Sequence, residues 1–222
     1  LGEMVGAGGV NPLVEMLSST SKLAHTSASA AIWHLSSMSP ATRAEIEKYN
    51  GIGKLVTLLS DGCPEAQRYA AAALWQLANN ANSKSAIVQA GGIPPLVHVL
   101  STIQVAEAQE SAAAVLSELA RAQQPNKSEI VDAGGIAPLV QALRGGSLQA
   151  TKHAAQCLWA LTQGNGGRDD RSKDHIEMLI EEAIAEPLIA LLGSDEPVAG
   201  GSPRRYLTSP HPTSPRLTLR ST

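Results

Sequence analysis

The sequence predicts an all-α fold built from stacked helical repeats, and three observations lead to this prediction. A six-residue pattern, AIWHLS at residues 31–36, recurs three times as ALWQLA, VLSELA and CLWALT, with 42 residues between the equivalent leucines. A second, unrelated marker repeats with nearly the same period. The composition is the third observation, because a chain with no Phe and only 3% aromatic residues builds its core from Ala, Leu, Ile and Val, which suits closely packed helices.

The second marker is a leucine that recurs in the five segments GGVNPLV, GIGKLV, GGIPPLV, GGIAPLV and AEPLI, four of which contain glycine. Its successive separations are 42, 41, 43 and 49 residues, and a further leucine follows four residues after each one. Two independent markers with one period establish the repeat. The marker leucines are Leu13, Leu55, Leu96, Leu139 and Leu188, and their followers are Leu17, Leu59, Leu100, Leu143 and Leu192.

Each unit divides into three expected helices. The middle helix begins after Gly-Gly or Gly and often carries proline in its first turn, as at Pro94 and Pro95, where a missing N–H costs least. A linker such as residues 60–64 ends this helix and starts the next. A shorter third helix, expected at residues 83–90, ends at Gly91, where glycine can adopt the left-handed cap conformation.

The long helix of each unit is rich in alanine. Two alanine positions recur four residues apart, so both lie on one helix face and mark a surface where a neighbouring helix comes close. Larger side chains there would overpack the contact. These positions are Ala24, Ala66, Ala108 and Ala150, and Ala28, Ala70, Ala112 and Ala154.

Three helices in a unit of about 42 residues, with the GGIxPLV-like and ALWxLA-like segments quoted above, resemble the armadillo repeat. The resemblance covers residues 1–192. It implies a right-handed α-solenoid of about four repeats plus a partial fifth, whose long helices line a concave groove for extended peptides or partner proteins.

Two departures from the pattern set the expected domain boundaries. Residues 164–170 lengthen the connection after the fourth long helix, and the fifth unit stops after its middle helix. We therefore expect a solenoid over residues 1–195 and a basic tail rich in Pro, Ser and Arg over residues 196–222, disordered unless bound. Serines precede proline three times in this tail, so proline-directed phosphorylation is a hypothesis there.

One position of the long helix carries tryptophan in three of four units, pointing away from the core of its own unit. The tryptophan register comprises Trp33, Trp75, Ser117 and Trp159. One interpretation is a ladder of aromatic platforms along the groove, suited to an extended peptide or an arginine-bearing segment. The other is that each Trp packs between adjacent long helices and fills space.

The next position holds His34, Gln76, Glu118 and Ala160. Armadillo proteins that read nuclear-import signals or cadherin-like tails commonly carry Asn at this register, and this sequence has none there. The Trp of import adaptors would stand one turn earlier, where the chain has Ala30, Ala72, Ala114 and Gln156. The sequence therefore does not match an import adaptor. The predicted partner-binding residues are Trp33, Trp75, Ser117, Trp159, His34, Gln76 and Glu118.

Composition and spacing exclude several other classes. A net charge of −3 gives no basic surface for nucleic acid, and two cysteines, Cys63 and Cys157, are too few for a disulfide scaffold. Glycines and prolines interrupt the longest uncharged stretch, residues 85–106, so we expect no membrane span. His153 and Cys157 share a helix face, but two ligands are too few for zinc, and we expect no metal, cofactor or catalytic site.

The sequence thus favours a non-catalytic scaffold that binds a protein or peptide partner, with a basic segment as one possibility. The alternatives are the substrate-binding part of a larger U-box-type ubiquitin ligase and a structural subunit of a large assembly. The chain begins at Leu1, which indicates a fragment or processed form with room for such a domain. We expect a reducing, intracellular setting, cytoplasmic by default and nuclear as the alternative.

Overall fold

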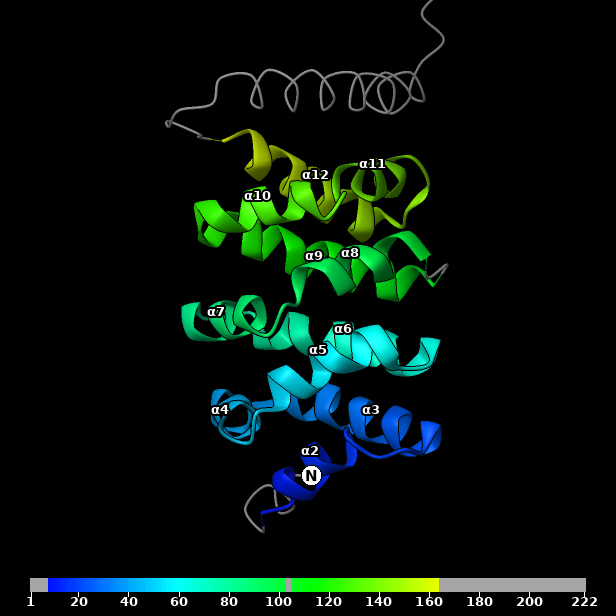
Figure 1. The fold of residues 1–222 in the computed structure, drawn as a ribbon, viewed down its shortest axis with the longest axis vertical. Helices are drawn as coiled ribbons and strands as arrows, with labels where there is room; N and C mark the ends of the chain where they lie inside the picture. The colour runs from blue at the N-terminus through cyan, green and yellow to red at the C-terminus, as the bar shows by residue number, and fades with distance from the viewer. Residues whose placement is uncertain (1–7, 103–104, 164–222) are drawn as a thin grey trace, which may run out of the picture.

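The computed structural model describes residues 8–102 and 105–163, and over these residues the chain is helical throughout. The helices lie one above another along a single axis, from α2 at one end to α12 at the other (Figure 1). Their bounds are α2 Val10–Met16, α3 Lys22–Met38, α4 Pro40–Lys48, α5 Gly51–Asp61, α6 Pro64–Leu77, α7 Ala81–Gln89, α8 Ile93–Thr102, α9 Ala106–Ala122, α10 Gln124–Asp132, α11 Ile136–Gly145 and α12 Leu148–Thr162.

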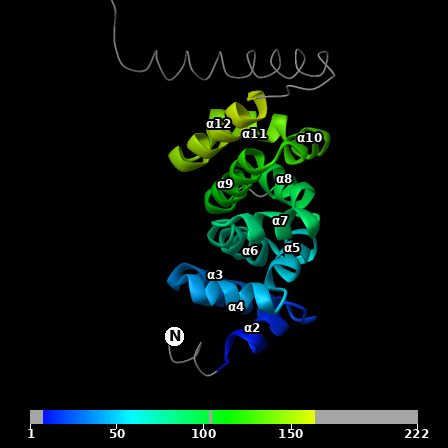
Figure 2. The same cartoon turned by 90° about the vertical axis from the view of Figure 1, so that its left-hand side faces the viewer.

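The long helices α3, α6, α9 and α12 form one side of the stack, and each packs on the long helix of the next unit. Figure 2 shows α6, α9 and α12 along one edge, with α5, α7, α8 and α10 along the other. The predicted three-helix unit is therefore confirmed for the described residues. The chain repeats it as a short helix, a middle helix and a long helix.

The interior is the leucine and alanine core that the composition predicts. Leu35, Leu77 and Leu119 are fully buried, and so are the middle-helix leucines Leu55 and Leu96. One predicted alanine position is buried in all four long helices, at Ala28, Ala70, Ala112 and Ala154. The other is buried at Ala66, Ala108 and Ala150, but Ala24 in the first turn of α3 is partly exposed. Small side chains there let successive long helices approach, which is why the chain needs no Phe.

The turn before each middle helix depends on two consecutive residues with different roles. Gly91 has a φ of +70°, as predicted, and Asn50 adopts a φ of 58° at the equivalent position of the preceding unit. A Cβ on the following Gly92 would stand 2.8 Å from the carbonyl oxygen of Ile87 and 3.3 Å from a methyl of Val56 in the preceding middle helix. The second glycine therefore sets how closely consecutive units pack.

The third helix of the unit differs slightly from the prediction, since α7 begins at Ala81 rather than at residue 83. Asn80 caps it, its side-chain oxygen accepting a hydrogen bond of 2.8 Å from the backbone N–H of Ser83. The prolines fall where expected: Pro64 occupies the first turn of α6, and Pro94 and Pro95 follow Ile93 at the start of α8.

Other predictions concern residues that the structure does not describe. They are the lengthened connection at residues 164–170, the partial fifth unit with Leu188 and Leu192, and the basic tail at residues 196–222. The boundary between solenoid and tail therefore stays a prediction. Within the described residues, every helix is too short or too polar to cross a bilayer.

Candidate functional site

The tryptophan register occupies the twelfth residue of every long helix, so its members recur along the axis of the stack. Trp33 and Trp75 are half-buried and pack against the core with one side. The ring of Trp33 lies 5.8 Å from that of Tyr69 on α6, centroid to centroid. Trp33 therefore packs against the next long helix and keeps part of its surface exposed, and its role as a binding platform stays a prediction.

Trp33 and Trp75 line the same depression on the long-helix side. Its volume is about 190 Å³, and it lies across α3, α6 and α9. Gln76, another predicted partner-binding residue, also contributes to its wall. The complete lining is Trp33, Arg68, Tyr69, Ala72, Trp75, Gln76, Glu107, Glu110 and Ser111. Ala72 and Ser111 are the small residues of this lining.

Charged side chains of both signs border this depression. The guanidinium of Arg68 lies 4.2 Å from the centroid of the Tyr69 ring, within cation–π distance. Glu107 and Glu110 approach from α9, on the other side of the tryptophans. The depression therefore combines aromatic faces with two carboxylates and one cation, a lining suited to side chains of a peptide rather than to a purely apolar ligand.

The structure buries Ser117, the one member of the tryptophan register that is not tryptophan. Its side chain is fully buried, and its hydroxyl has no hydrogen-bond partner among the described residues. Trp75 on α6 and His153 on α12 meet in an edge-to-face contact with their ring centroids 5.5 Å apart. Since α6 and α12 both pack on α9, this contact spans α9, where Ser111, Ala114 and Ser117 are small and buried.

The environment of His153 lowers its pKa below the usual 6.5. Burial beside the Trp75 ring is the largest cause, and a hydrogen bond with Gln156 opposes it. Lys152 and Arg121 add smaller effects in the same direction as burial, while Glu110 acts against it. A neutral imidazole at this place can make the edge-to-face contact with Trp75 without the cost of burying a charge.

His34 and Glu118 lie beside the tryptophan register with different surroundings. His34 is exposed, and its ring centroid is 4.6 Å from that of Trp33. Glu118 forms an ion pair of 2.6 Å with Lys84 of α7 and a second with Arg121. The Glu118 carboxylate is therefore occupied by two cations of its own chain.

Trp159 is the most exposed member of its register, with 60% of its surface accessible. It lies on α12, in the last unit that the structure describes, and it does not line the depression. The structure thus brings together Trp33, Trp75 and Gln76, places His34 beside them, and leaves Ser117 inside and Trp159 apart.

Sequence reasoning missed Arg68, Tyr69, Glu107 and Glu110, and it considered His153 only as a metal ligand. A signal for the charged ones was present, because Arg68 and Glu110 lie seven residues before Trp75 and Ser117, and seven residues return to nearly the same helix face. Tyr69 and His153 carried no such signal. Their contacts join neighbouring or next-nearest units, and the packing of long helices alone reveals them.

The two possible metal ligands named from the sequence, His153 and Cys157, do not belong to a metal site within the described residues. His153 and Cys157 lie on α12, and no group of three or more possible ligands gathers in the part of the chain that the structure describes. Burial raises the pKa of the Cys157 thiol to about 12, so it stays protonated at neutral pH. Cys63 and Cys157 are both free thiols.

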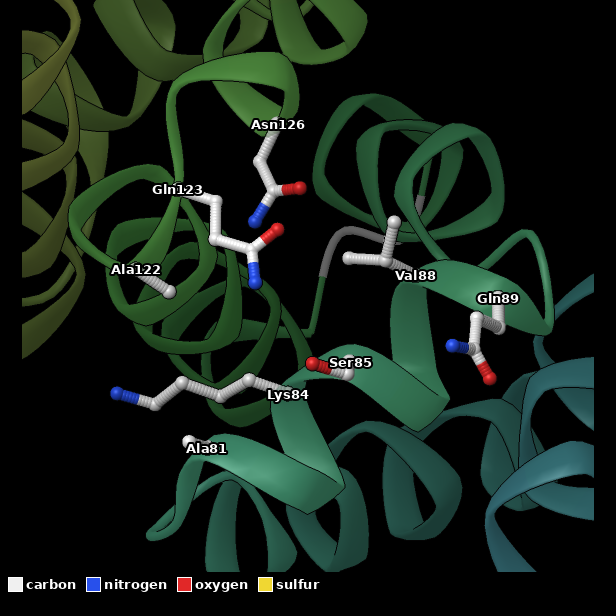
Figure 3. A pocket seen from close by; sticks show the side chains of 8 residues that line it. All are labelled: Ala81, Lys84, Ser85, Val88, Gln89, Ala122, Gln123 and Asn126. Carbon is white, nitrogen blue, oxygen red and sulfur yellow. The ribbon is translucent and has the colours of Figure 1, made fainter.

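A second depression, of about 360 Å³, lies between α7 and the corner of α9 and α10 (Figure 3). Five of its eight lining residues carry polar side chains, namely Lys84, Ser85, Gln89, Gln123 and Asn126. The amide of Asn126 donates a hydrogen bond of 2.8 Å to the carbonyl of Leu119 and ties α10 to the end of α9. No aromatic side chain lines this second depression.

Comparison with known proteins supports the repeat. Residues 80–121 and 123–162 match the armadillo/beta-catenin-like repeat. An engineered protein of known crystal structure is 30% identical, with a TM-score of 0.69 over 85% of this chain and 73% of its own. A designed armadillo repeat protein in complex with the peptide (KR)4 is 24% identical, with a TM-score of 0.69 over 88% of this chain and 79% of its own.

A computationally designed armadillo repeat protein for modular peptide recognition is also 24% identical, with a TM-score of 0.70 over 84% of this chain and 76% of its own. No curated protein sequence matched the chain. The periodic leucines, the three-helix unit and these matches agree, and the chain belongs to the armadillo/beta-catenin-like repeat family.

Proposed function

We propose that this chain is a non-catalytic scaffold that holds an extended peptide segment of a partner protein across its stacked long helices. The observation that carries the proposal is the depression across α3, α6 and α9, where Trp33 and Trp75 present half-buried rings beside carboxylates. Large aromatic side chains in such depressions supply much of the binding free energy in protein interfaces.

A basic side chain of the partner fits this depression best. Glu107 and Glu110 offer two carboxylates against the one guanidinium of Arg68, and the tryptophan faces attract cations. A designed protein of the same fold was crystallised with the peptide (KR)4, which supports a basic segment without assigning one to this chain.

The predicted site residues enter the proposal with different weights. Trp33, Trp75 and Gln76 form the centre, and His34 lies at its edge. Trp159 offers a further aromatic surface one long helix beyond α9. Glu118 and Ser117 would contribute only after a rearrangement, since one is ion-paired and the other is buried.

The cellular setting and the wider assembly are also proposals. Two free thiols, Cys63 and Cys157, are consistent with a reducing, intracellular compartment, which we take to be the cytoplasm. The depression lined by Trp33 and Trp75 would equally serve as the substrate-binding part of a U-box-type ubiquitin ligase or as a contact within a large assembly. No described feature favours either of these over a free-standing scaffold.

The test begins with peptides selected on the chain from a displayed random library and re-synthesised with a fluorescent label. Replacing Trp33 and Trp75 together with alanine is expected to weaken their binding by about 30-fold or more, since buried aromatic anchors contribute about 2 kcal/mol or more. The matched control is Leu148→Ala, which removes a side chain that is 83% exposed and outside the depression.

Circular dichroism shows whether the double variant stays folded, and Glu107→Lys gives a second route because its side chain is exposed. Glu107→Lys is expected to weaken basic peptides selectively. Unchanged binding by both variants contradicts the groove assignment. Loss of the fold in the double variant, with normal binding by Glu107→Lys, shows that the tryptophans serve packing alone.

A further inference from the structure

A row of charged residues of alternating sign runs parallel to the tryptophan register. The fifth residue of each long helix is Thr26 on α3, Arg68 on α6, Glu110 on α9 and Lys152 on α12. From α6 to α12 the charge along the stack therefore changes from positive to negative and back to positive. The long helices stack one after another along the axis of the molecule (Figure 2), so residues at the same position of each long helix follow one another along that axis.

The charged row lies on the same helix face as the tryptophan register. Each of its members stands seven residues before a member of that register, and seven residues in an α-helix make nearly two turns. The depression confirms the arrangement for two members, since Arg68 and Glu110 line it together with Trp33 and Trp75. The third member, Lys152 on α12, is exposed and does not line the depression, so its place on this face follows from the seven-residue spacing to Trp159.

The three charges are available to a ligand. Ion pairs among the described residues join Lys54 to Glu15 and Glu118 to Lys84 and Arg121, and none includes a member of the row. Arg68 lies over the Tyr69 ring, but the N–H donors of a guanidinium point outward in its plane and stay free when its face is covered.

We propose that the surface of the long helices α6, α9 and α12 selects a partner segment with the complementary charge order. This segment is acidic opposite Arg68, basic opposite Glu110 and acidic opposite Lys152. Packed helices are about 8–10 Å apart, and an extended chain advances about 3.3 Å per residue, so the three charges fall about three residues apart. The inference rests on the proposed function, because it needs a peptide that runs across the stacked long helices from α6 to α12. It replaces a uniformly basic segment with one of mixed charge.

The probes are three fluorescein-labelled synthetic peptides of equal length that differ only in their charged positions. The first carries an acid, an arginine and an acid three residues apart, with Ser and Leu between them. The second has the opposite order, and the third is basic at all three positions. The first peptide is expected to bind about tenfold more tightly than the second at low salt, with the preference shrinking as salt is added.

Exchanging the charges of the row provides the decisive comparison. The triple variant Arg68→Glu, Glu110→Arg and Lys152→Glu is expected to reverse the preference between the first two peptides. The control variant Asp132→Arg changes an exposed charge on α10, away from the row, and is expected to leave the preference as in the native chain.

The outcomes separate this inference from the proposed function. Equal affinity for all three peptides, with binding still lost in the Trp33 and Trp75 double variant, overturns the charge order and leaves the groove in place. Tightest binding by the basic peptide overturns the charge order in favour of a uniformly basic partner. No binding by any of these peptides or by the library peptides overturns both proposals.

Discussion

Two registers of the long helices lie two residues apart, and they differ in how far their side chains are buried. The leucine register, Leu35, Leu77, Leu119 and Leu161, holds one residue type and is buried in every unit, with at most 7% of a side chain exposed. The tryptophan register varies from fully buried at Ser117 to 60% exposed at Trp159. Both have the same period, so the period alone does not make a position structural or functional.

The physical difference between the registers is the source of their neighbours. A leucine of the inner register packs in the interior that all three helix types of the repeat share, so its surroundings recur with the repeat. A residue of the outer register meets side chains from other long helices, such as Tyr69 and His153, and these differ in every unit. The inner register therefore serves stability, and the surroundings of the outer register leave it free to vary from unit to unit.

The largest effect that tests this comparison is on the free energy of unfolding. Leu77→Ala removes a fully buried side chain from the centre of the stack and is expected to lower that free energy by about 2–5 kcal/mol. Trp159→Ala removes a larger but exposed side chain and is expected to change it by less than about 0.5 kcal/mol. Urea unfolding followed by circular dichroism measures both. Similar losses in the two variants contradict the division into registers.

A smaller effect separates two buried serines. Ser83 is fully buried, and its hydroxyl donates to the Glu47 carboxylate, so Ser83→Ala is expected to cost about 1.5–3 kcal/mol. Ser117 is equally buried without a partner for its hydroxyl, so Ser117→Ala is expected to leave stability unchanged or to raise it. The same unfolding measurement applies. A large loss in Ser117→Ala shows instead that its hydroxyl is bonded in solution.

The smallest expected effect is a pH dependence from His153, whose pKa in the folded chain is below 6.5. The unfolded chain then binds a proton more readily than the folded chain, so stability falls as the pH drops from 6.5 through the lowered pKa. His153→Gln is expected to remove this part of the slope while the other histidines still titrate. Unfolding at several pH values from 5 to 8 checks this. Parallel curves for the two proteins contradict it.

The sequence predicted most of the fold because the repeat carries its own internal comparison. Equivalent leucines and alanines recur in the four units that have a long helix, and each unit confirms the others, as the burial of Leu77 and Leu119 and the left-handed Gly91 show. Its error at the start of α7 was two residues in length, because the helix begins directly after the Asn80 cap. Repetition thus predicts what the units have in common and nothing of what sets one apart.

The candidate site shows the same division. The sequence predicted that Trp33, Trp75 and Gln76 lie on one side of the stack, because helix geometry alone determines the face that a residue occupies. It could not predict that Ser117 is buried, since this depends on the contact between Trp75 and His153 across α9. Nor could it predict the pairing of Glu118 with Lys84, whose helices come together through the stacking of consecutive units.

The sequence by itself therefore determined the repeat, the helices and the side of each helix that faces the core, because these follow from local periodicity. The tertiary structure decided which of the outward residues are available to a partner. In the folded chain Ser117 is buried, Glu118 is ion-paired with Lys84, and Trp159 is exposed. Trp33 and Trp75 line one depression together with Arg68 and Glu110. Those outcomes depend on side chains from different units, and distances between units are set only when the helices pack.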